Sequence, residues 1–186
     1  MDTAVQYRID TQKSLFTVHP FATGLAATLS HGLTIAVRDF TGSARFVPGT
    51  LAQASLKMRI KSDSLVLTDE MKEDDRREVE QTMKRDVLRT SDHPEIVFES
   101  SSVASTHLGG NLHKVDVIGM LTLNGTTRPQ SFTAQVVLSG STLRANGEFK
   151  TRQTDFGIPL ITAGAGLIKL HDELKLHFYI VAEKVD

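Results

Sequence analysis

Alternation of apolar and polar residues is the strongest pattern in this sequence. Apolar side chains recur at every second position in three segments, residues 54–61, 143–150 and 174–181. Because successive side chains of a β-strand point to opposite faces, each segment is predicted to be a strand with one apolar face. Weaker alternation predicts further strands, which fall within residues 14–19, 33–46, 95–103, 115–123 and 132–138.

Turn-forming residues separate these predicted strands. Asn124-Gly125 directly follows an apolar strand, and this pair is preferred in type I′ hairpin turns. Pro48-Gly49 and Gly109-Gly110 provide similar breaks. About eight strands with short connections predict an all-β fold with minor helices, either an antiparallel sandwich or a barrel. No change in composition divides the chain, so residues 1–186 are predicted to form one domain.

Two helices interrupt the predicted strands. The larger lies within residues 73–89, where Val79, Met83 and Val87 recur at intervals of four and are predicted to be buried against the sheet. The charged residues around them favour a solvated helix face over a partner surface. A smaller helix is predicted over residues 24–30, with Thr23 as its N-cap.

Composition and charge exclude several classes of function. The chain of 186 residues has a formal net charge of -1, which gives no electrostatic support for binding nucleic acid or an anionic membrane. It has no Cys, which excludes disulfides, thiolate zinc sites, iron–sulfur clusters and a cysteine nucleophile. We expect no cofactor. A homodimer is left open by the sequence.

The sequence carries no recognisable targeting or membrane-spanning segment. The start of the sequence shows no secretory signal, so a cytoplasmic location is expected, or a periplasmic one if the N-terminus has been trimmed. Residues 14–37 carry no formal charge when His is neutral. Pro20, Gly24 and Gly32 make this segment a poor membrane-spanning helix, so no transmembrane segment is predicted and a buried or ligand-facing segment is favoured.

No arrangement of residues points to catalysis or a metal. The seven His residues form no H-x-x-x-H pair, and no G-x-S-x-G motif is present. His107 and His113 flank a glycine-rich turn and would face each other across a hairpin, with Asp116 as a further metal ligand. Surface histidines are the favoured interpretation, so neither a catalytic residue nor a metal site is predicted.

Two predicted loops are unusual because they are apolar. Residues 20–33 and 157–168 contain no formal charge, although loops are normally polar and exposed. Apolar loops must cover either a packed core or the opening of a cavity. We therefore predict that both segments lie at one end of the barrel, as a plug or as a gate to a hydrophobic pocket. His31 is either a structural residue or a contact for a polar head group.

Several motifs, in order along most of the chain, resemble the YceI-like family, also called polyisoprenoid-binding or lipid-binding YceI-like domains. The most specific are His93-Pro94-Glu95-Ile96-Val97-Phe98-Glu99-Ser100 and the hairpin from Gly119-Met120-Leu121-Thr122-Leu123 through Asn124-Gly125 to Pro129. Weaker matches are Tyr7-Arg8-Ile9-Asp10, Arg38-Asp39-Phe40-Thr41-Gly42 and Arg152-Gln153-Thr154-Asp155-Phe156-Gly157. The resemblance implies a lipocalin-like antiparallel β-barrel with an apolar tunnel. It also implies an isoprenoid or another amphiphilic lipid as the ligand, and no catalytic residues.

The function predicted from the sequence is non-enzymatic binding, transport or sequestration of an elongated apolar or amphiphilic molecule, such as an isoprenoid, a quinone or a fatty acyl chain. The predicted ligand-binding residues are Phe16, Val18, His31, Leu56, Met58, Ile60, Phe98, Leu121, Phe132, Phe149, Phe156, Leu176 and Phe178. One alternative is an enzyme or isomerase that uses His31, Arg152 and Asp155 at the barrel mouth. Another is a filled barrel that binds a protein partner through its helix.

Overall fold

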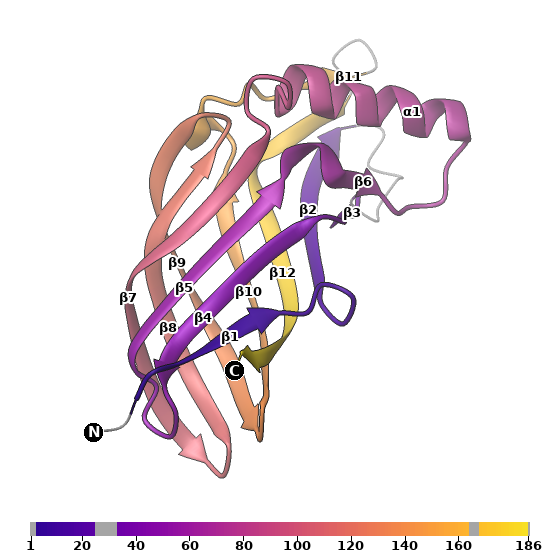
Figure 1. Ribbon diagram of the computed structural model, residues 1–186. Helices are drawn as coiled ribbons and strands as arrows, with labels where there is room; N and C mark the ends of the chain where they lie inside the picture. The colour runs from indigo at the N-terminus through magenta and orange to yellow at the C-terminus, as the bar shows by residue number, and fades with distance from the viewer. Residues whose placement is uncertain (1–2, 25–32, 164–167, 186) are drawn as a thin grey trace.

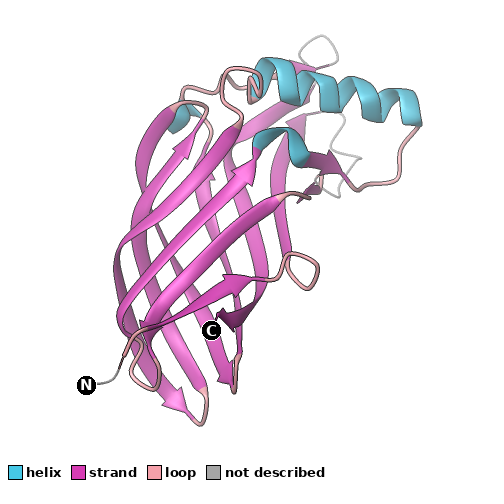
Figure 2. Cartoon of the chain, in the orientation of Figure 1, coloured by secondary structure: helices cyan, strands magenta, loops and turns pink. Residues whose placement is uncertain are grey.

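Antiparallel β-strands make up most of the protein in the computed structural model, which describes residues 3–24, 33–163 and 168–185 (Figures 1 and 2). The strands are β1 (Val5–Ile9), β2 (Leu15–Gly24), β3 (Ile35–Val37), β4 (Phe40–Val47), β5 (Ala52–Lys61), β6 (Leu65–Leu67), β7 (Glu95–Gly109), β8 (Leu112–Leu123), β9 (Thr126–Ser139), β10 (Thr142–Arg152), β11 (Thr162–Ala163) and β12 (Ile168–Val185).

Eight of these strands close into a barrel, in the order β1-β4-β5-β7-β8-β9-β10-β12, with β12 pairing back onto β1. The prediction of an antiparallel barrel of this size is therefore confirmed. Strands β2, β3 and β6 extend the sheet beyond β12, so β6 is an edge strand. The segment predicted as one strand at 33–46 is two strands, because β3 pairs with β2 and β6 whereas β4 pairs with β1 and β5.

The alternation in the sequence sets the inner and outer faces of the barrel. On β10, Leu143 faces the interior, whereas its neighbour Arg144 and the outward Glu148 are exposed. On β12, Leu176 and Ile180 are buried in the same interior. This period-two pattern buries one apolar face of each strand, which is the main stabilising contribution in a barrel.

The β8–β9 hairpin has the turn that the sequence predicts. Asn124 and Gly125 have φ angles of 49° and 72°, so both lie in the left-handed region that a type I′ turn requires. Glycine tolerates this region without steric cost, and Asn does so better than most residues. This turn and helix α1 lie at the same end of the barrel (Figure 1).

The main helix, α1 (Glu73–Thr82), continues as a π-helical turn over Met83–Val87 and crosses one end of the barrel (Figure 1). The predicted burial of its apolar face is only partly correct. Met83 and Val87 are partly buried and pack on the core, but Val79 is 39% exposed. The predicted short helix over 24–30 lies outside the described residues, except for Gly24, which ends β2.

Candidate ligand-binding cavity

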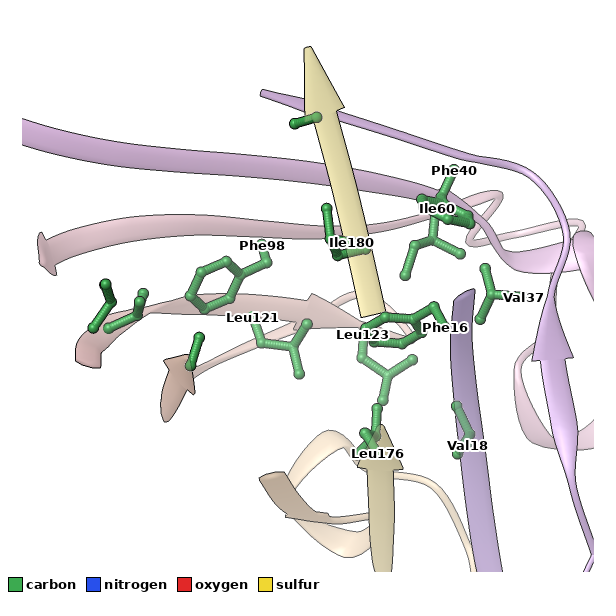
Figure 3. Packing of buried hydrophobic residues seen from close by; sticks show 14 of the residues in the cluster. Phe16, Val18, Val37, Phe40, Ile60, Phe98, Leu121, Leu123, Leu176 and Ile180 are labelled. Atoms are coloured by element: carbon green, nitrogen blue, oxygen red, sulfur yellow. The ribbon is translucent and has the colours of Figure 1, made fainter. Parts of the chain in front are cut away.

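A cavity of about 1170 Å³ occupies the interior of the barrel. This volume exceeds the roughly 300–1,000 Å³ usual for small-molecule pockets. Aliphatic and aromatic side chains from all eight barrel strands line it. The close view shows how side chains from opposite walls, including Phe16, Phe98 and Leu121, converge on this space (Figure 3).

Four phenylalanines on β7, β9, β10 and β12 form an aromatic cluster in the wall. Phe132 on β9 is its centre, with ring centroids 5.4 Å from Phe98, 5.5 Å from Phe149 and 5.5 Å from Phe178. Aromatic pairs at these separations attract each other beyond the effect of area burial. The cluster gives the middle of the cavity a rigid, apolar wall.

Most of the residues predicted to bind a ligand line this cavity. They are Phe16, Val18, Leu56, Met58, Ile60, Phe98, Leu121, Phe132, Phe149, Leu176 and Phe178. Phe156 does not: it is buried in the short 3-10 turn Thr154–Phe156 and faces a separate groove. His31 lies outside the described residues.

The cavity is long as well as apolar. On β10 its lining runs from Leu143, beside the β9–β10 hairpin, to Thr151 near the end that carries α1. The eight steps from Leu143 to Thr151, at about 3.3 Å each on a strand tilted by about 40°, give a length of about 20 Å along the barrel axis. The space therefore suits an extended chain rather than a compact molecule.

Most polar lining residues lie at the end of the cavity that α1 crosses, which we call the mouth, whereas Ser55 lies near the start of β5 at the other end. The mouth-facing stripe of α1 consists of Asp75, Glu78, Val79, Thr82 and Met83, with the spacing of one helix face. Sequence reasoning missed this stripe because it treated the charges of the segment as a solvated surface. Asp75 lies four residues before Val79, so the two share one face of the helix. This spacing was the signal that could have revealed the stripe.

Three uncharged polar side chains also line the cavity near the mouth. They are Gln130 on β9, Thr151 on β10 and Gln153 just after β10. Thr151 and Gln153 are buried, with 9% and 5% of their surfaces exposed. The Gln153 side chain donates from Nε2 to the backbone oxygen of His171, at 2.9 Å.

The apolar segments 20–33 and 157–168 meet at the same end where the structure describes them. Gly24 pairs with Ile168 across β2 and β12. Pro20, Leu33 and Ile158 contribute to the cavity lining. The remainder of both segments, on which gating would depend, lies outside the described residues.

Of the residues in the alternative enzyme hypothesis, Arg152 and Asp155 do not line the main cavity, and His31 lies outside the described residues. Arg152 and Asp155 line a separate groove of about 350 Å³, together with Arg128, Lys150 and Glu173. The Arg128 side chain donates from Nε to the backbone oxygen of Asp155, at 3.0 Å. The groove is therefore a charged surface feature that is distinct from the apolar interior.

His107 and His113 face each other across the β7–β8 hairpin, as the sequence predicted, with ring centroids 5.1 Å apart. The Asp116 carboxylate does not join them, because it accepts a hydrogen bond from Thr133 at 2.6 Å and pairs with Lys114 at 3.1 Å. His113 is buried, so the interpretation of these residues as surface histidines is wrong for His113, and its Nδ1 atom has no hydrogen-bond partner among the described residues. Burial, followed by the charge of His107, lowers the pKa of His113.

A closed antiparallel barrel with an apolar internal cavity defines the class of this protein. A family model described as the YceI-like domain matches residues 7–182. The chain belongs to the YceI-like family, as its motifs predicted. A comparison with curated proteins finds no significant match.

Three solved structures share this fold. Burkholderia cenocepacia BcnA is 23% identical with a TM-score of 0.71, over 93% of this chain and 98% of that one. A polyisoprenoid binding domain from Saccharophagus degradans, implicated in plant cell wall breakdown, is 14% identical with a TM-score of 0.69, over 96% and 98%. The Campylobacter jejuni YCEI protein is 16% identical with a TM-score of 0.62, over 82% and 85%. Among the described residues, no helix is long and apolar enough to cross a membrane.

Proposed function

We propose that this protein binds an elongated apolar or amphiphilic molecule inside its barrel and carries or sequesters it without changing it chemically. The observation that supports this most strongly is the apolar cavity of about 1170 Å³ that follows the barrel axis. An isoprenoid, a quinone or a fatty acyl chain has the shape and polarity that such a space accepts. The whole chain, residues 1–186, would act as one binding domain.

The free energy of binding would come mainly from burial of the apolar tail of the ligand. A ligand that buries about 300 Å² of apolar surface gains about 7.5 kcal/mol at about 25 cal/mol per Å². Association costs several kcal/mol in lost translation and rotation. The preformed aromatic wall around Phe132 limits the further cost of ordering side chains. After an association cost of about 4 kcal/mol, a tail of this size leaves about 3.5 kcal/mol, which is millimolar affinity, so tighter binding requires a longer tail that buries more apolar surface.

The comparisons support the same class of ligand. The Saccharophagus degradans domain is named for polyisoprenoid binding, and its fold matches this chain over nearly the full length of both. A polyisoprenoid is an elongated apolar chain, which agrees with the dimensions of the cavity. We extend to this protein the class of ligand and not its identity.

The alternatives have less support. A filled barrel that works only as a protein-interaction module would leave the cavity without a role. An enzyme would need reactive polar groups that converge on the bound molecule, and Arg152 and Asp155 lie in the separate groove instead. An apolar interior supports binding without catalysis better than it supports an enzyme, because it offers few reactive groups.

Native mass spectrometry of freshly purified protein, followed by organic extraction, tests the proposal. We expect a protein species with one additional molecule, which the extract identifies as a long-chain compound. After extraction, the delipidated protein should take up a neutral long-chain alcohol with a stoichiometry of about one, because the barrel holds one extended tail. The proposed function would be rejected if neither the freshly purified nor the delipidated protein bound a long-chain molecule.

A further inference from the structure

Backbone pairing between β9 and β10 ends before either strand does. The last residues that join the two strands are Glu148 and Thr133, although β10 continues to pair with β12 and β9 continues to pair with β8. In the same register, the next residues would place Pro129 opposite Arg152, and a proline has no N–H to donate. This part of the barrel wall, near the end that carries α1, therefore lacks a backbone ladder between β9 and β10.

The charged groove of about 350 Å³ lies at this part of the wall and shares two residues with the cavity. Gln130 on β9 and Thr151 on β10 line both spaces. The Gln130 side chain crosses to β10, where its Nε2 donates to the backbone oxygen of Lys150 at 3.2 Å. Thr151 is only 9% exposed, and its hydroxyl has no hydrogen-bond partner among the described residues. A hydroxyl without a partner at this boundary can be satisfied by a bound molecule.

Two guanidinium groups of the groove are not neutralised by ion pairs. Lys150 pairs with Glu173 at 2.7 Å, whereas neither Arg128 nor Arg152 forms an ion pair in the described part of the chain. The Arg128 side chain donates from Nε to the backbone oxygen of Asp155, which leaves its two terminal NH₂ groups as donors. With three basic and two acidic residues in its described lining, the groove has a net charge of +1.

A further carboxylate near Arg152 is committed to another partner. The Asp172 carboxylate accepts hydrogen bonds from the backbone N–H and the hydroxyl of Thr154, at 2.8 and 2.7 Å. These bonds lower the pKa of Asp172, and the charge of Arg152 makes a smaller contribution. Asp172 does not line the groove. The Arg152 guanidinium therefore keeps its N–H donors for a molecule in the groove.

We propose that the groove holds the anionic head group, a phosphate or a carboxylate, of a molecule whose apolar tail lies in the barrel, and that this head group leaves the barrel between β9 and β10. The inference rests on the proposed function, since it names the class of ligand and its head-group site. Guanidinium groups bind phosphate and carboxylate oxygens through paired N–H donors, which Arg128 and Arg152 supply. Thr151, which lines both spaces, donates from its hydroxyl to the same head group.

Three ligands separate the head group from the tail. Decyl phosphate, decan-1-ol and inorganic phosphate are titrated into delipidated protein by calorimetry, as monomers and at about 0.02 M salt. We expect decyl phosphate to bind about tenfold or more tightly than decan-1-ol, because charge-assisted hydrogen bonds add to burial of the tail. Inorganic phosphate should bind about a hundredfold or more weakly than decyl phosphate, because it has no tail to bury. Salt at about 0.5 M should reduce the difference between the phosphate and the alcohol.

A matched pair of variants on β10 assigns the effect to the groove. Arg144 and Arg152 are both exposed, and neither forms an ion pair with a described residue, but only Arg152 lines the groove. Arg152→Gln should lower the ratio of the affinities for decyl phosphate and decan-1-ol about threefold or more. Arg144→Gln removes the same charge from the same strand and should leave this ratio unchanged, since Coulomb energy falls with distance. Thermal unfolding checks that both variants fold.

Thr151→Val tests the passage between the strands. Valine keeps the shape of the side chain and lacks the hydroxyl, and its introduction leaves no described group without a partner. The ratio of the affinities for decyl phosphate and decan-1-ol should fall about threefold, because the head group loses one hydrogen bond. An unchanged ratio would overturn the route past Thr151.

The remaining outcomes separate this inference from the proposed function. If decyl phosphate binds no more tightly than decan-1-ol, the head-group site is overturned and the binding function stands. Equal effects of the Arg144 and Arg152 variants overturn the assignment to the groove. If inorganic phosphate binds as tightly as decyl phosphate, the groove takes a free anion and its link to the tail is overturned. Failure of both long-chain ligands to bind overturns the proposed function, and this inference with it.

Discussion

The Glu80 side chain accepts a hydrogen bond from the backbone N–H of Leu67, with 2.8 Å between Leu67 N and Glu80 Oε1. Arg76, one helical turn earlier, donates to the backbone oxygen of the same Leu67. Leu67 ends β6, the edge strand of the sheet, and edge strands expose backbone groups that need partners. The two α1 side chains supply these partners, and so they join the helix at the mouth to the sheet.

Removing Glu80 should loosen α1 without disturbing the barrel. In Glu80→Ala, the Leu67 N–H loses a charged acceptor, a contact worth about 1.5–3 kcal/mol. Hydrogen exchange should therefore accelerate in residues 73–87 and remain unchanged in β8 and β9. Arg77→Ala is the control, because Arg77 is exposed on the same helix and contacts only Glu73 in the described structure. Equal exchange in both variants would contradict the role of the Leu67 contact.

Filling the cavity should shorten the tail that it accepts. Ala145 on β10 lines the cavity and pairs with Ile180 and Val136. Ala145→Phe adds a ring to open space, so we expect thermal stability within about 1 kcal/mol of wild type. Binding of long-chain alcohols should weaken while that of short-chain alcohols is retained. Competition assays with alcohols of different length measure this, and unchanged selectivity would argue that the tail lies elsewhere.

Gly147 should be intolerant of a larger side chain. A Cβ atom at this position would lie 2.6 Å from the Thr133 backbone oxygen and 2.7 Å from Phe178 Cζ. Gly147→Ala therefore forces the Phe178 ring or the backbone to shift, with a cost of about 1–3 kcal/mol. Urea unfolding monitored by circular dichroism measures this cost. An unchanged midpoint would show that the ring moves freely and that the cavity wall is not rigid.

His113 should make the protein sensitive to mild acid. The pKa of His113 lies below the ordinary value of an imidazole, mainly because of burial and then because of the charge of His107. The unfolded state therefore binds protons more readily, and stability present above about pH 6.5 declines as the pH falls below it. The pKa of His19 is also lowered, first by burial and then by His177 and Lys175, and it adds to the same decline.

His113→Leu isolates this contribution. The variant removes a buried Nδ1 atom for which the described part of the chain offers no hydrogen-bond partner, so its stability at about pH 7.5 should equal or exceed that of wild type by about 1 kcal/mol. Its loss of stability between about pH 7.5 and about pH 5.5 should be smaller. Urea unfolding at both pH values measures the difference. An equal loss in the variant would assign the acid sensitivity to other groups.

Alternation predicted the barrel because burial in an antiparallel strand has a period of two. The inward positions of β5, β10 and β12 follow directly from this rule, and so do wall residues such as Met58, Phe149 and Phe178. Phe156 does not line the cavity because it lies in a 3-10 turn, to which strand alternation does not apply. Closure of β12 onto β1 and the separation of β3 from β4 depend on long-range pairing, which no local pattern encodes.

The place of Asp75 and Glu78 in the cavity lining could not be predicted from charge alone. An acidic helix face is usually solvated, and only the position of α1 at one end of the barrel brings Asp75 and Glu78 into the cavity lining. The same position explains why Val79 is exposed although its spacing predicted burial. Val79 faces the open mouth instead of a packed sheet.

A titration series of straight-chain alcohols of increasing length tests the central claim, that a tail binds inside the barrel. Each added CH₂ group should improve the free energy of binding by up to about 0.8 kcal/mol until the tail fills the cavity, after which the affinity should level off. In Ala145→Phe the plateau should come at a shorter chain. Affinity that is independent of chain length, or that rises without a plateau and is unaffected by the variant, would show that the tail does not occupy this cavity.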